Sequence, residues 1–315
     1  MRKGLLSVII PAYNEERIIA KAAETISCLL GEQQIDYEII FVDDGSKDNT
    51  WLEIRKQAEK NGRIGGVSFS RNFGKESAIY AGLEHALGDC CVVIDCDLQH
   101  PPEKILDMYA KWQEGFEVVE GVKADRGKEN VLHGIAASIF YKIISSAVHI
   151  DMSRASDFKL LDRKVVNILI NMKESHAFFR ALSSWVGFKS CQIEYEVRER
   201  EEGISKWSTW SLIKYAVKNI TSFSSKPLHI VTLCGLITLI LSVVLGIHTL
   251  YQKLSGGALE GFTTVILLQL FFSSILMLSL GIIGYYLANI YDEIKGRPRY
   301  IIEKEITAES RKMLC

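Results

Sequence analysis

The fold is decided by residues 6–30, which read LSVIIPAYNEERIIAKAAETISCLL. Residues 6–10 are a short apolar run of the kind that forms a buried β-strand, and the polar segment 11–16 ends it. In residues 15–30 the apolar side chains recur at intervals of three and four positions, which predicts an amphipathic helix. The segment therefore predicts a strand, a polar loop and a helix in succession.

The same succession recurs through the first 120 residues. Further apolar, β-rich runs predict strands at residues 38–42, 66–70, 90–94 and 117–120. Helical patterns lie between them, at residues 51–60, 75–87 and 103–114. Strands that are apolar almost throughout and alternate with helices imply a parallel sheet covered on both faces. We therefore expect an α/β domain in this part of the chain.

The composition excludes some classes of protein and points to a membrane. The 315 residues carry a formal net charge of −1, whereas a nucleic-acid-binding protein would show a strong basic excess. The mean hydropathy of +0.11 is high for a chain that is 24% charged. Such an average implies that the apolar residues are segregated into one region of the chain.

Two runs without Asp, Glu, Lys or Arg account for this average, at residues 228–250 and 262–290. As a helix, the first run would be about 34 Å long, which is enough for a hydrocarbon core of about 30 Å. A pair of buried core helices is the alternative, but two such runs in succession favour a transmembrane hairpin. The connector between them is short.

Basic residues flank the hairpin on both outer sides. They are Lys206, Lys214, Lys218 and Lys226 before it, and Lys295, Arg297, Arg299 and Lys304 after it. A basic excess marks the cytoplasmic side, so we expect a multi-pass protein of the inner (cytoplasmic) membrane with its large N-terminal domain in the cytoplasm. The apolar residues 5–10 form too short a run for a signal peptide.

Polar clusters follow each of the first four predicted strands, at residues 11–16, 43–50, 71–75 and 95–102. Each cluster taken alone could be a turn or a helix cap. Parallel sheets, however, bind ligands beyond the carboxyl ends of their strands, and all four clusters lie at that edge. Together they predict a ligand site.

Asp95 and Asp97 are the most specific pair in these clusters. Alternate residues at the end of a strand can direct two carboxylates into one space, where they repel each other unless a cation is bound. Mg²⁺ or Mn²⁺ prefers such oxygen ligands and usually shares its coordination shell with substrate phosphates. The sequence thus predicts a metal-assisted diphosphate site, while the absence of GxGxxG after the first strand excludes a dinucleotide-binding turn.

At these residues the sequence resembles the family 2 glycosyltransferases, which have the GT-A fold. The segments that carry the resemblance are SVIIPAYNEE (7–16), IIFVDDGSKDNT (39–50), SRNFGK (70–75) and IDCDLQHPPE (94–103). It continues through SDFKLLD (156–162) and REREEGISKW (198–207), which are followed by the two apolar runs. Those later segments are similar to the polyprenyl-phosphate branch, which includes bactoprenol glucosyltransferases and is similar to dolichol-phosphate mannose synthases.

The resemblance implies a Rossmann-like, mostly parallel sheet and a set of functional residues. The residues expected to bind the nucleotide-sugar are Pro11, Tyr13, Glu15, Asp43, Asp44, Asn72, Gly74, Lys75 and Asp95. The residues expected to hold the metal are Asp97, Gln99 and Asp95. The catalytic candidates are Asp157 and Arg200, and those for the acceptor phosphate are Arg198, Arg200, Ser205 and Lys206. Whether Asp157 is a general base or only orients a substrate stays open.

The implied reaction is an inverting transfer of a hexose from a UDP-sugar, with UDP-glucose first, to a polyprenyl phosphate such as undecaprenyl (bactoprenol) phosphate. UDP-N-acetylhexosamine, UDP-aminoarabinose and GDP-mannose are alternative donors. A non-catalytic membrane sugar-nucleotide sensor is an alternative of another class. A processive polysaccharide synthase is disfavoured, because its QxxRW motif is absent.

The predicted organisation has four parts: a catalytic domain at 1–206, a juxtamembrane amphipathic helix at 207–227, the hairpin at 228–290 and a cytoplasmic tail at 291–315. Helical apolar spacing at 208–225 favours a place in the membrane interface, and at 131–150 interface and core packing are balanced. Small residues in the second run, Ser273, Ser274, Gly281 and Gly284, suggest homo-oligomerisation. The tail after residue 302 adds nothing to the resemblance.

Overall fold

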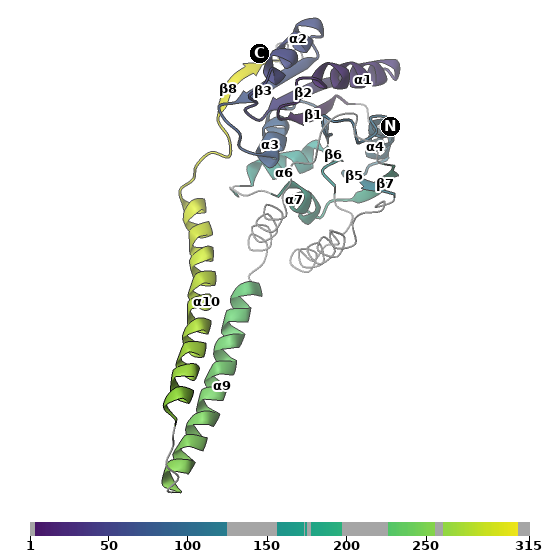
Figure 1. The fold of residues 1–315 in the computed structure, drawn as a ribbon. Coiled ribbons are helices and arrows are strands. Elements are labelled where there is room, and N and C mark those ends of the chain that lie inside the picture. The colour runs from purple at the N-terminus through teal and green to yellow at the C-terminus, as the bar shows by residue number, and fades with distance from the viewer. Residues whose placement is uncertain are drawn as a thin grey trace. The chain divides into compact units, whose positions relative to one another are not determined.

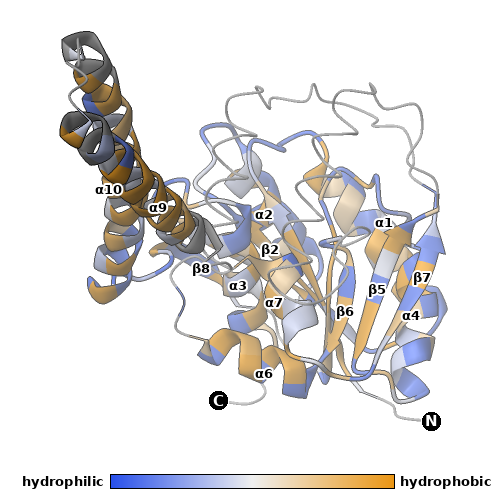
Figure 2. Ribbon diagram, turned by 90° about the horizontal axis from the view of Figure 1, so that it is seen from below, coloured by the Kyte–Doolittle hydropathy of each residue, from blue (hydrophilic) through white to orange (hydrophobic). Residues whose placement is uncertain are grey.

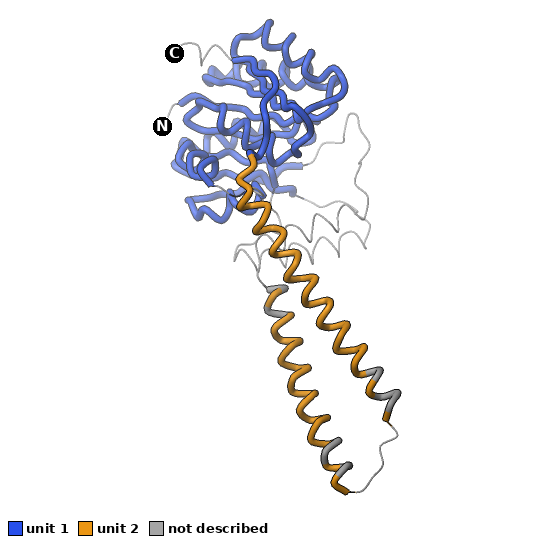
Figure 3. Tube along the Cα trace, turned by 90° about the vertical axis from the view of Figure 1, so that its left-hand side faces the viewer, with its two compact units in different colours: residues 1–212, 298–315 blue, residues 213–297 orange. Residues whose placement is uncertain are grey.

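The computed structural model describes residues 4–124, 156–172, 174, 178–196, 226–255 and 261–307. The chain divides into two compact units, which are residues 1–212 with 298–315, and residues 213–297 (Figure 3). The predicted acceptor segment 198–206, the helical segments 131–150 and 208–225, and the boundary near residue 206 lie outside the described residues.

The first unit is built on a sheet whose described strands have the order β7-β5-β6-β4-β1-β2-β3-β8 (Figure 1). Their bounds are β1 Leu6–Ala12, β2 Tyr37–Asp43, β3 Ile64–Phe69, β4 Cys90–Val93, β5 Val118–Lys123, β6 Lys159–Asp162, β7 Ser190–Tyr195 and β8 Ile302–Ile306. The four strands β4, β1, β2 and β3 are parallel, and β5 is parallel to β7. Strands β6 and β8 are antiparallel to their neighbours. The mostly parallel sheet expected from the sequence is confirmed.

Helices cover both faces of this sheet (Figures 1 and 2). Their bounds are α1 Ile19–Glu32, α2 Thr50–Lys60, α3 Lys75–His85, α4 Lys104–Gln113, α6 Arg163–Asn171 and α7 Phe179–Trp185. The side chains of Val8 and Ile10 pack with α1 and α4 in one core. Ile9 lies on the opposite face, where a Cβ atom added to Gly82 would be 2.3 Å from its Cγ2. The glycine therefore allows α3 to pack closely on β1.

Helix α1 begins at Ile19, four residues after the predicted start at Glu15. The intervening residues belong to the loop, because the Glu15 N–H donates to Thr50 Oγ1 at 2.8 Å and the Glu16 N–H donates to the Asp48 carboxylate. Asn14 has a φ of 55°, a left-handed conformation that interrupts a helix. Bonds to a neighbouring loop thus override the local helical pattern.

The chain after helix α10 (Phe262–Ile294) returns to the sheet, within the segment 291–315 that the sequence predicts as a tail. Strand β8 pairs antiparallel with β3, and just before it the Tyr300 ring stacks on Phe69 with 4.9 Å between centroids. The Arg299 guanidinium lies 4.5 Å from the Tyr80 ring centroid. The Ile-Glu-Lys-Glu-Ile pattern resembles a solvated tail because an edge strand with exposed side chains needs few apolar residues.

The second unit contains two long helices, α9 Lys226–Leu254 and α10 Phe262–Ile294, which lie side by side (Figures 1 and 3). Val231–His248 and Leu268–Ile294 are long and apolar enough to cross a membrane, and neither segment is buried inside the protein. The two runs predicted as a hairpin are therefore helical in their described parts. Figure 2 shows both helices as mainly hydrophobic.

Candidate active site

The loops after β1 and β2 are bonded directly to each other. The Asn14 N–H donates to Ser46 Oγ at 2.9 Å, and Asn14 Oδ1 in turn accepts from the Lys47 N–H at 2.9 Å. Because β1 and β2 are adjacent and parallel, both loops leave the sheet at the same edge. Tyr13 lies in the first loop and its side chain is exposed, whereas Pro11 is buried within β1. Pro11, which is one of the residues expected to bind the nucleotide, therefore lies in strand β1 and not in the loop.

Asp44 joins the loop after β2 to the loop after β3. Its carboxylate accepts from the N–H groups of Phe73 and Gly74, at 2.7 and 2.9 Å, and from Asn72 Nδ2 at 2.9 Å. Burial raises the pKa of Asp44 to about 6, although the two N–H groups oppose the shift. Asp43 is likewise used inside the protein, where it accepts from the Ser68 hydroxyl at 2.8 Å. Through these bonds, both aspartates fix the backbone of the segments that are predicted to line the nucleotide site.

Lys75 connects the loop after β4 to the segment before β6. Its Nζ atom lies 2.6 Å from Asp95 Oδ1 and 2.8 Å from Asp157 Oδ2. On the other side of Asp157, Arg180 Nε donates to Oδ1 at 2.7 Å and Nη2 donates to Oδ2 at 2.8 Å. The structure thus brings together three predicted site residues, Asp95, Lys75 and Asp157, and adds Arg180 to them.

The charges in this cluster keep its carboxylates ionised. Burial alone would raise the pKa of Asp157, but the positive charges of Lys75 and Arg180 hold it well below its ordinary value. Burial also acts against the ionised form of Asp95, and Lys75 again prevails and lowers its pKa. Two cations thus balance two carboxylates at the centre of the site.

Glu76 behaves differently from these two aspartates. Burial raises its pKa to about 7, and the nearby Asp157 charge adds to the shift. Its carboxylate accepts from the Phe179 N–H at 2.8 Å, so it binds the first turn of α7 to the first turn of α3. Glu76 therefore connects the helix that carries Lys75 to the helix that carries Arg180.

The loop that carries Asp97 and Gln99 is anchored by the stacking of aromatic rings. Asp97 Oδ1 accepts from the Gln99 N–H at 3.1 Å, and Leu98 between them has a φ of 54°. His100 is buried and stacks on Phe158, with 5.0 Å between ring centroids. The stack anchors the loop next to the segment that carries Asp157.

The predicted metal ligands offer oxygen atoms only, which fits Mg²⁺ or Mn²⁺. Within the described ranges, no group of three or more His, Cys, Asp or Glu side chains is arranged to hold a metal ion. Asp95 and Asp97 alone could therefore supply only part of a coordination shell. An ion held by one or two carboxylates would need substrate phosphates and water to complete its shell.

Sequence reasoning missed Arg180 and Glu76. Neither belongs to a motif that resembles the family, and Arg180 lies in α7, 23 residues after Asp157. Counting charge could have indicated it, because Asp95 and Asp157 need two cations and Lys75 supplies one. The predicted acceptor residues Arg198, Arg200, Ser205 and Lys206 lie outside the described part of the chain.

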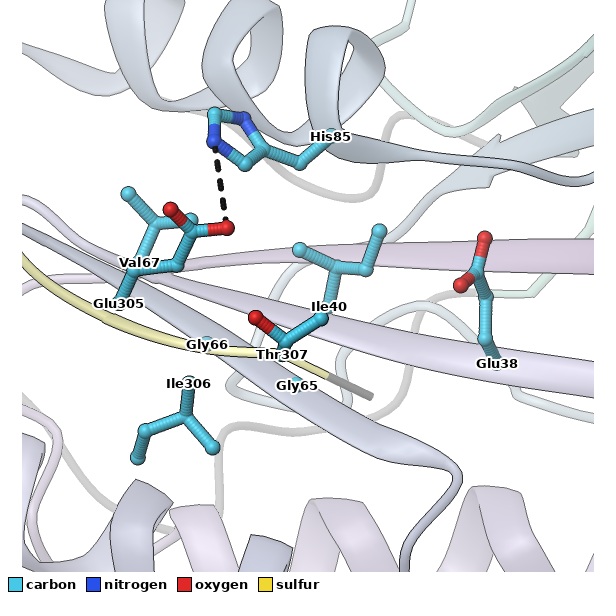
Figure 4. A pocket seen from close by; sticks show the side chains of 9 residues that line it. All are labelled: Glu38, Ile40, Gly65, Gly66, Val67, His85, Glu305, Ile306 and Thr307. Carbon is cyan, nitrogen blue, oxygen red and sulfur yellow. Dashed lines mark ion pairs between the residues drawn. The ribbon is translucent and has the colours of Figure 1, made fainter. Parts of the chain in front are cut away.

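A small pocket lies at the other edge of the sheet, at the amino ends of β2 and β3 (Figure 4). Its charged groups already have partners. His85 Nε2 lies 3.8 Å from Glu305 Oε1, and Glu38 accepts from Ser7 Oγ and the Leu87 N–H, both at 2.6 Å. The pocket is therefore part of the contact between α3 and the returning strand β8, away from the loop cluster.

The chain is similar in sequence to a known family and to proteins of known sequence. The family model described as glycosyl transferase family 2 matches residues 7–181. The uncharacterized glycosyltransferase YkcC of Bacillus subtilis (strain 168) is 39% identical over 98% of this chain and 96% of its own. The SfII prophage-derived bactoprenol glucosyl transferase of Shigella flexneri is 36% identical over 95% of this chain and 97% of its own.

Among solved structures, glucosyl-3-phosphoglycerate synthase from Mycobacterium tuberculosis in complex with Mn²⁺ and uridine-diphosphate-glucose is 20% identical, with a TM-score of 0.48. That similarity covers 69% of this chain and 77% of the synthase chain. The family assignment itself depends on the sequence matches, which extend over more than half of the chain for the family model and over nearly all of it for the relatives. The resemblance noted in the loop motifs is thus confirmed: the chain belongs to glycosyl transferase family 2 and is a glycosyltransferase.

Proposed function

We propose that this protein transfers a hexose from a UDP-sugar, with UDP-glucose as the first candidate, to a polyprenyl phosphate at the cytoplasmic face of a membrane, with inversion. The observation that carries the proposal is the joining of loops at one edge of the sheet, where Asp44 holds the third loop and Lys75 joins Asp95 to Asp157. The full-length relatives that are named bactoprenol glucosyl transferases support the acceptor class. The apolar helices α9 and α10 support a lipid substrate.

The donor would occupy the loops after β1, β2 and β3. Tyr13 and Glu15 in the first loop, with Asn72 and Gly74 in the third, form the proposed wall of the uridine site. The aspartates Asp43 and Asp44 maintain that wall through their bonds to Ser68, Phe73 and Gly74. Preformed loops reduce the entropy that the protein loses when it binds the nucleotide.

The diphosphate would lie near Asp95, Asp97 and Gln99, which we propose as the ligands of Mg²⁺ or Mn²⁺. When bound there, the ion would supply positive charge against the negative charge that develops on the UDP leaving group. Lys75 places a cation of the protein beside this group, with 2.6 Å between its Nζ atom and Asp95 Oδ1. It would contribute a second positive charge to the same phosphates.

The attacking group would be the phosphate of the lipid acceptor. The second pKa of a phosphate monoester is about 6, so this nucleophile is largely ionised at neutral pH and needs little help from a base. Because two cations keep Asp157 ionised, it is a weak base, and orientation of the sugar or the acceptor is the role that its surroundings favour. Arg200 would hold the acceptor phosphate as a bidentate partner, together with Arg198, Ser205 and Lys206.

A panel of labelled sugar nucleotides offered to the purified protein with undecaprenyl phosphate tests the proposal. We expect a labelled lipid product with UDP-glucose and Mg²⁺ or Mn²⁺. Transfer only from UDP-N-acetylhexosamine, UDP-aminoarabinose or GDP-mannose would change the donor and keep the reaction class. Tight nucleotide binding without transfer from any donor would favour the sugar-nucleotide sensor instead.

The membrane arrangement is part of the same proposal. The basic residues at the outer ends of the two helices, such as Lys226 at the start of α9 and Arg297 just after α10, support a hairpin with both ends in the cytoplasm. Labelling of a cysteine introduced into the connector 256–260, compared with labelling of the native Cys315, would check it, with only the connector reached from outside the cell. Ser273, Ser274, Gly281 and Gly284 support a homo-oligomer, which cross-linking in the membrane would detect.

A further inference from the structure

The side chain of Asp157 is clamped on both carboxylate oxygens. Arg180 Nε donates to Oδ1 at 2.7 Å, and Oδ2 accepts from both Arg180 Nη2 and Lys75 Nζ, each at 2.8 Å. Asp157 is only 5% exposed, so water competes little for these bonds. A carboxylate held by three charge-assisted bonds has one orientation open to it.

Arg180 can form this clamp only because α7 is fixed from two sides. The helix has seven residues, which is too short for an isolated helix to be stable. On one side the Glu76 carboxylate accepts from the Phe179 N–H at 2.8 Å. On the other side the fully buried Lys159 donates to Ser183 Oγ at 2.9 Å and to the Arg180 carbonyl at 3.3 Å.

Lys159 is itself held by a second ion pair, with 3.0 Å between its Nζ atom and Glu120 Oε1. The series of contacts therefore runs from β5 through β6 to α7, and ends at Asp157. Glu120 also accepts from the Ser156 N–H at 3.1 Å, so the residue just before Asp157 is bound to the same group. The backbone and the side chain of Asp157 are thus both fixed by this network.

We propose that Arg180 is a positioning residue for sugar transfer, which acts by holding the Asp157 carboxylate in one orientation beside Lys75. The inference rests on the proposed function, because Asp157 is the carboxylate expected beside the sugar. Arg180 needs no contact with either substrate for this role. Its whole effect on the reaction passes through Asp157.

This dependence is tested by a double-mutant cycle on turnover. Arg180→Gln removes the two charged bonds, and we expect kcat for labelled transfer to fall about 100-fold, the scale that a misplaced group costs, with a KM for the donor within about threefold of wild type. In an Asp157→Asn background the same change should reduce kcat less than about threefold, because the group that Arg180 positions has already been altered. Arg180→Lys should recover part of the lost rate.

A role limited to folding gives a different result. Arg180→Gln would then reduce the amount of active protein by the same factor in the wild-type background and in the Asp157→Asn background, and this equal loss would overturn the proposal. Wild-type turnover of Arg180→Gln would also overturn it. Arg55→Gln removes an arginine from an exposed pair with Glu59 on α2 and serves as the matched control, with unchanged turnover expected.

A second cycle on thermal unfolding does not need turnover. If Arg180 holds Asp157, the decreases in the thermal unfolding midpoint of Arg180→Gln and Asp157→Asn should add up to more than the decrease of the double variant. Additive decreases would show that the two side chains do not interact, and would overturn the proposal. Absence of transfer by the wild-type protein from every donor would instead refute the proposed function. Coupled unfolding in that case still supports the Asp157–Arg180 contact, so the two failures are distinguished.

Discussion

The Nζ atom of Lys75 lies 2.6 Å from Oδ1 of Asp95, so the third loop of the sheet edge is bound by an ion pair to the predicted metal loop. Lys75 opens helix α3, and Asp95 follows strand β4. The same ammonium group lies 2.8 Å from Asp157. One flexible cation therefore keeps two carboxylates together before any ligand binds.

Replacement of this cation should separate the two carboxylates. In Lys75→Met the mutual repulsion of Asp95 and Asp157 is no longer balanced, and we expect a loss of about 1–2 kcal/mol in the free energy of unfolding. The expected loss in the free energy of unfolding is small because the Lys75 side chain is 41% exposed to water. Thermal unfolding measures it. Mg²⁺ should reverse part of the decrease in the thermal unfolding midpoint, because a divalent ion at Asp95 would replace the missing positive charge.

Lys56→Met is the matched control for this variant, since Lys56 makes an exposed pair with Glu53 on α2. We expect a change within about 0.5 kcal/mol and no response to Mg²⁺. An equal loss in both variants, or a Lys75→Met midpoint that Mg²⁺ leaves unchanged, would argue against a shared charge-balanced site.

Asp97→Ala tests the metal proposal directly. It removes a carboxylate from the predicted ligand set and leaves the ion pairs of Asp95 and Asp157 with Lys75 intact. We expect loss of detectable transfer with an unfolding midpoint within about 3 °C of wild type. Chelation of divalent ions should abolish transfer by the wild-type protein, and added Mg²⁺ or Mn²⁺ should restore it.

The control for this variant is Asp107→Ala on α4, where the carboxylate is 54% exposed and pairs with Lys104. Its transfer rate should equal that of the wild type. Wild-type turnover by Asp97→Ala, or activity that survives chelation, would remove the metal from the proposed mechanism.

Much of the fold could be predicted because its first half is periodic. Strands β1 to β4 are apolar almost throughout and alternate with amphipathic helices, and this pattern alone indicates a covered parallel sheet. Strands β6, β7 and β8 were not predicted. β6 has only four residues and β8 has only two apolar side chains, so their sequences do not distinguish them from loops. β7 alternates polar and apolar residues from Ser190 to Tyr195, which is a strand signal that sequence reasoning missed.

The site was predictable to the extent that its residues stand in motifs. Asp95 and Lys75 follow predicted strands, and the resemblance singled out Asp157 in a later segment. The link among them was not predictable, because it depends on the reach of the Lys75 side chain between two loops. Arg180 could not be found from a motif either, since α7 is held in place by buried polar contacts from other elements.

The returning segment before β8 should contribute to the stability of the catalytic unit. Tyr300 stacks on Phe69 with 4.9 Å between ring centroids, and its hydroxyl donates to the Glu84 carboxylate. Tyr300→Ala should lower the free energy of unfolding by about 1–2 kcal/mol, because it removes the ring contact and opens the packing beside β3. Denaturant titration measures this loss.

Tyr300→Phe separates the two contributions, since it keeps the ring and removes only the hydroxyl. It should cost less than about 1 kcal/mol, because the lost hydrogen bond is exposed. Equal stability of Tyr300→Ala and the wild type would show that the segment does not stabilise the sheet.

The raised pKa of Glu76 predicts a pH dependence of stability. Its pKa is about 7 in the folded protein, because of burial and the charge of Asp157, and 4.5 is its ordinary value. Between these values the folded state binds more protons than the unfolded state, so this carboxyl makes stability fall as the pH rises from about 4.5 to about 7. Because Glu76 ionises more readily in the unfolded chain, it should lower the free energy of unfolding by roughly 2–3 kcal/mol as the pH rises from about 4.5 to 8.

Glu76→Gln removes this titration and keeps an oxygen that can accept from the Phe179 N–H. Unfolding midpoints measured from pH 4.5 to 8 should therefore converge for the two proteins at low pH, with the variant becoming the more stable one as the pH rises. Glu59→Gln, which changes a 69% exposed side chain on α2, is the matched control and should follow the wild-type curve at every pH. Parallel curves for Glu76→Gln and the wild type would mean that Glu76 is already ionised near its ordinary pKa, and that α7 is joined to α3 by a charged rather than a protonated group.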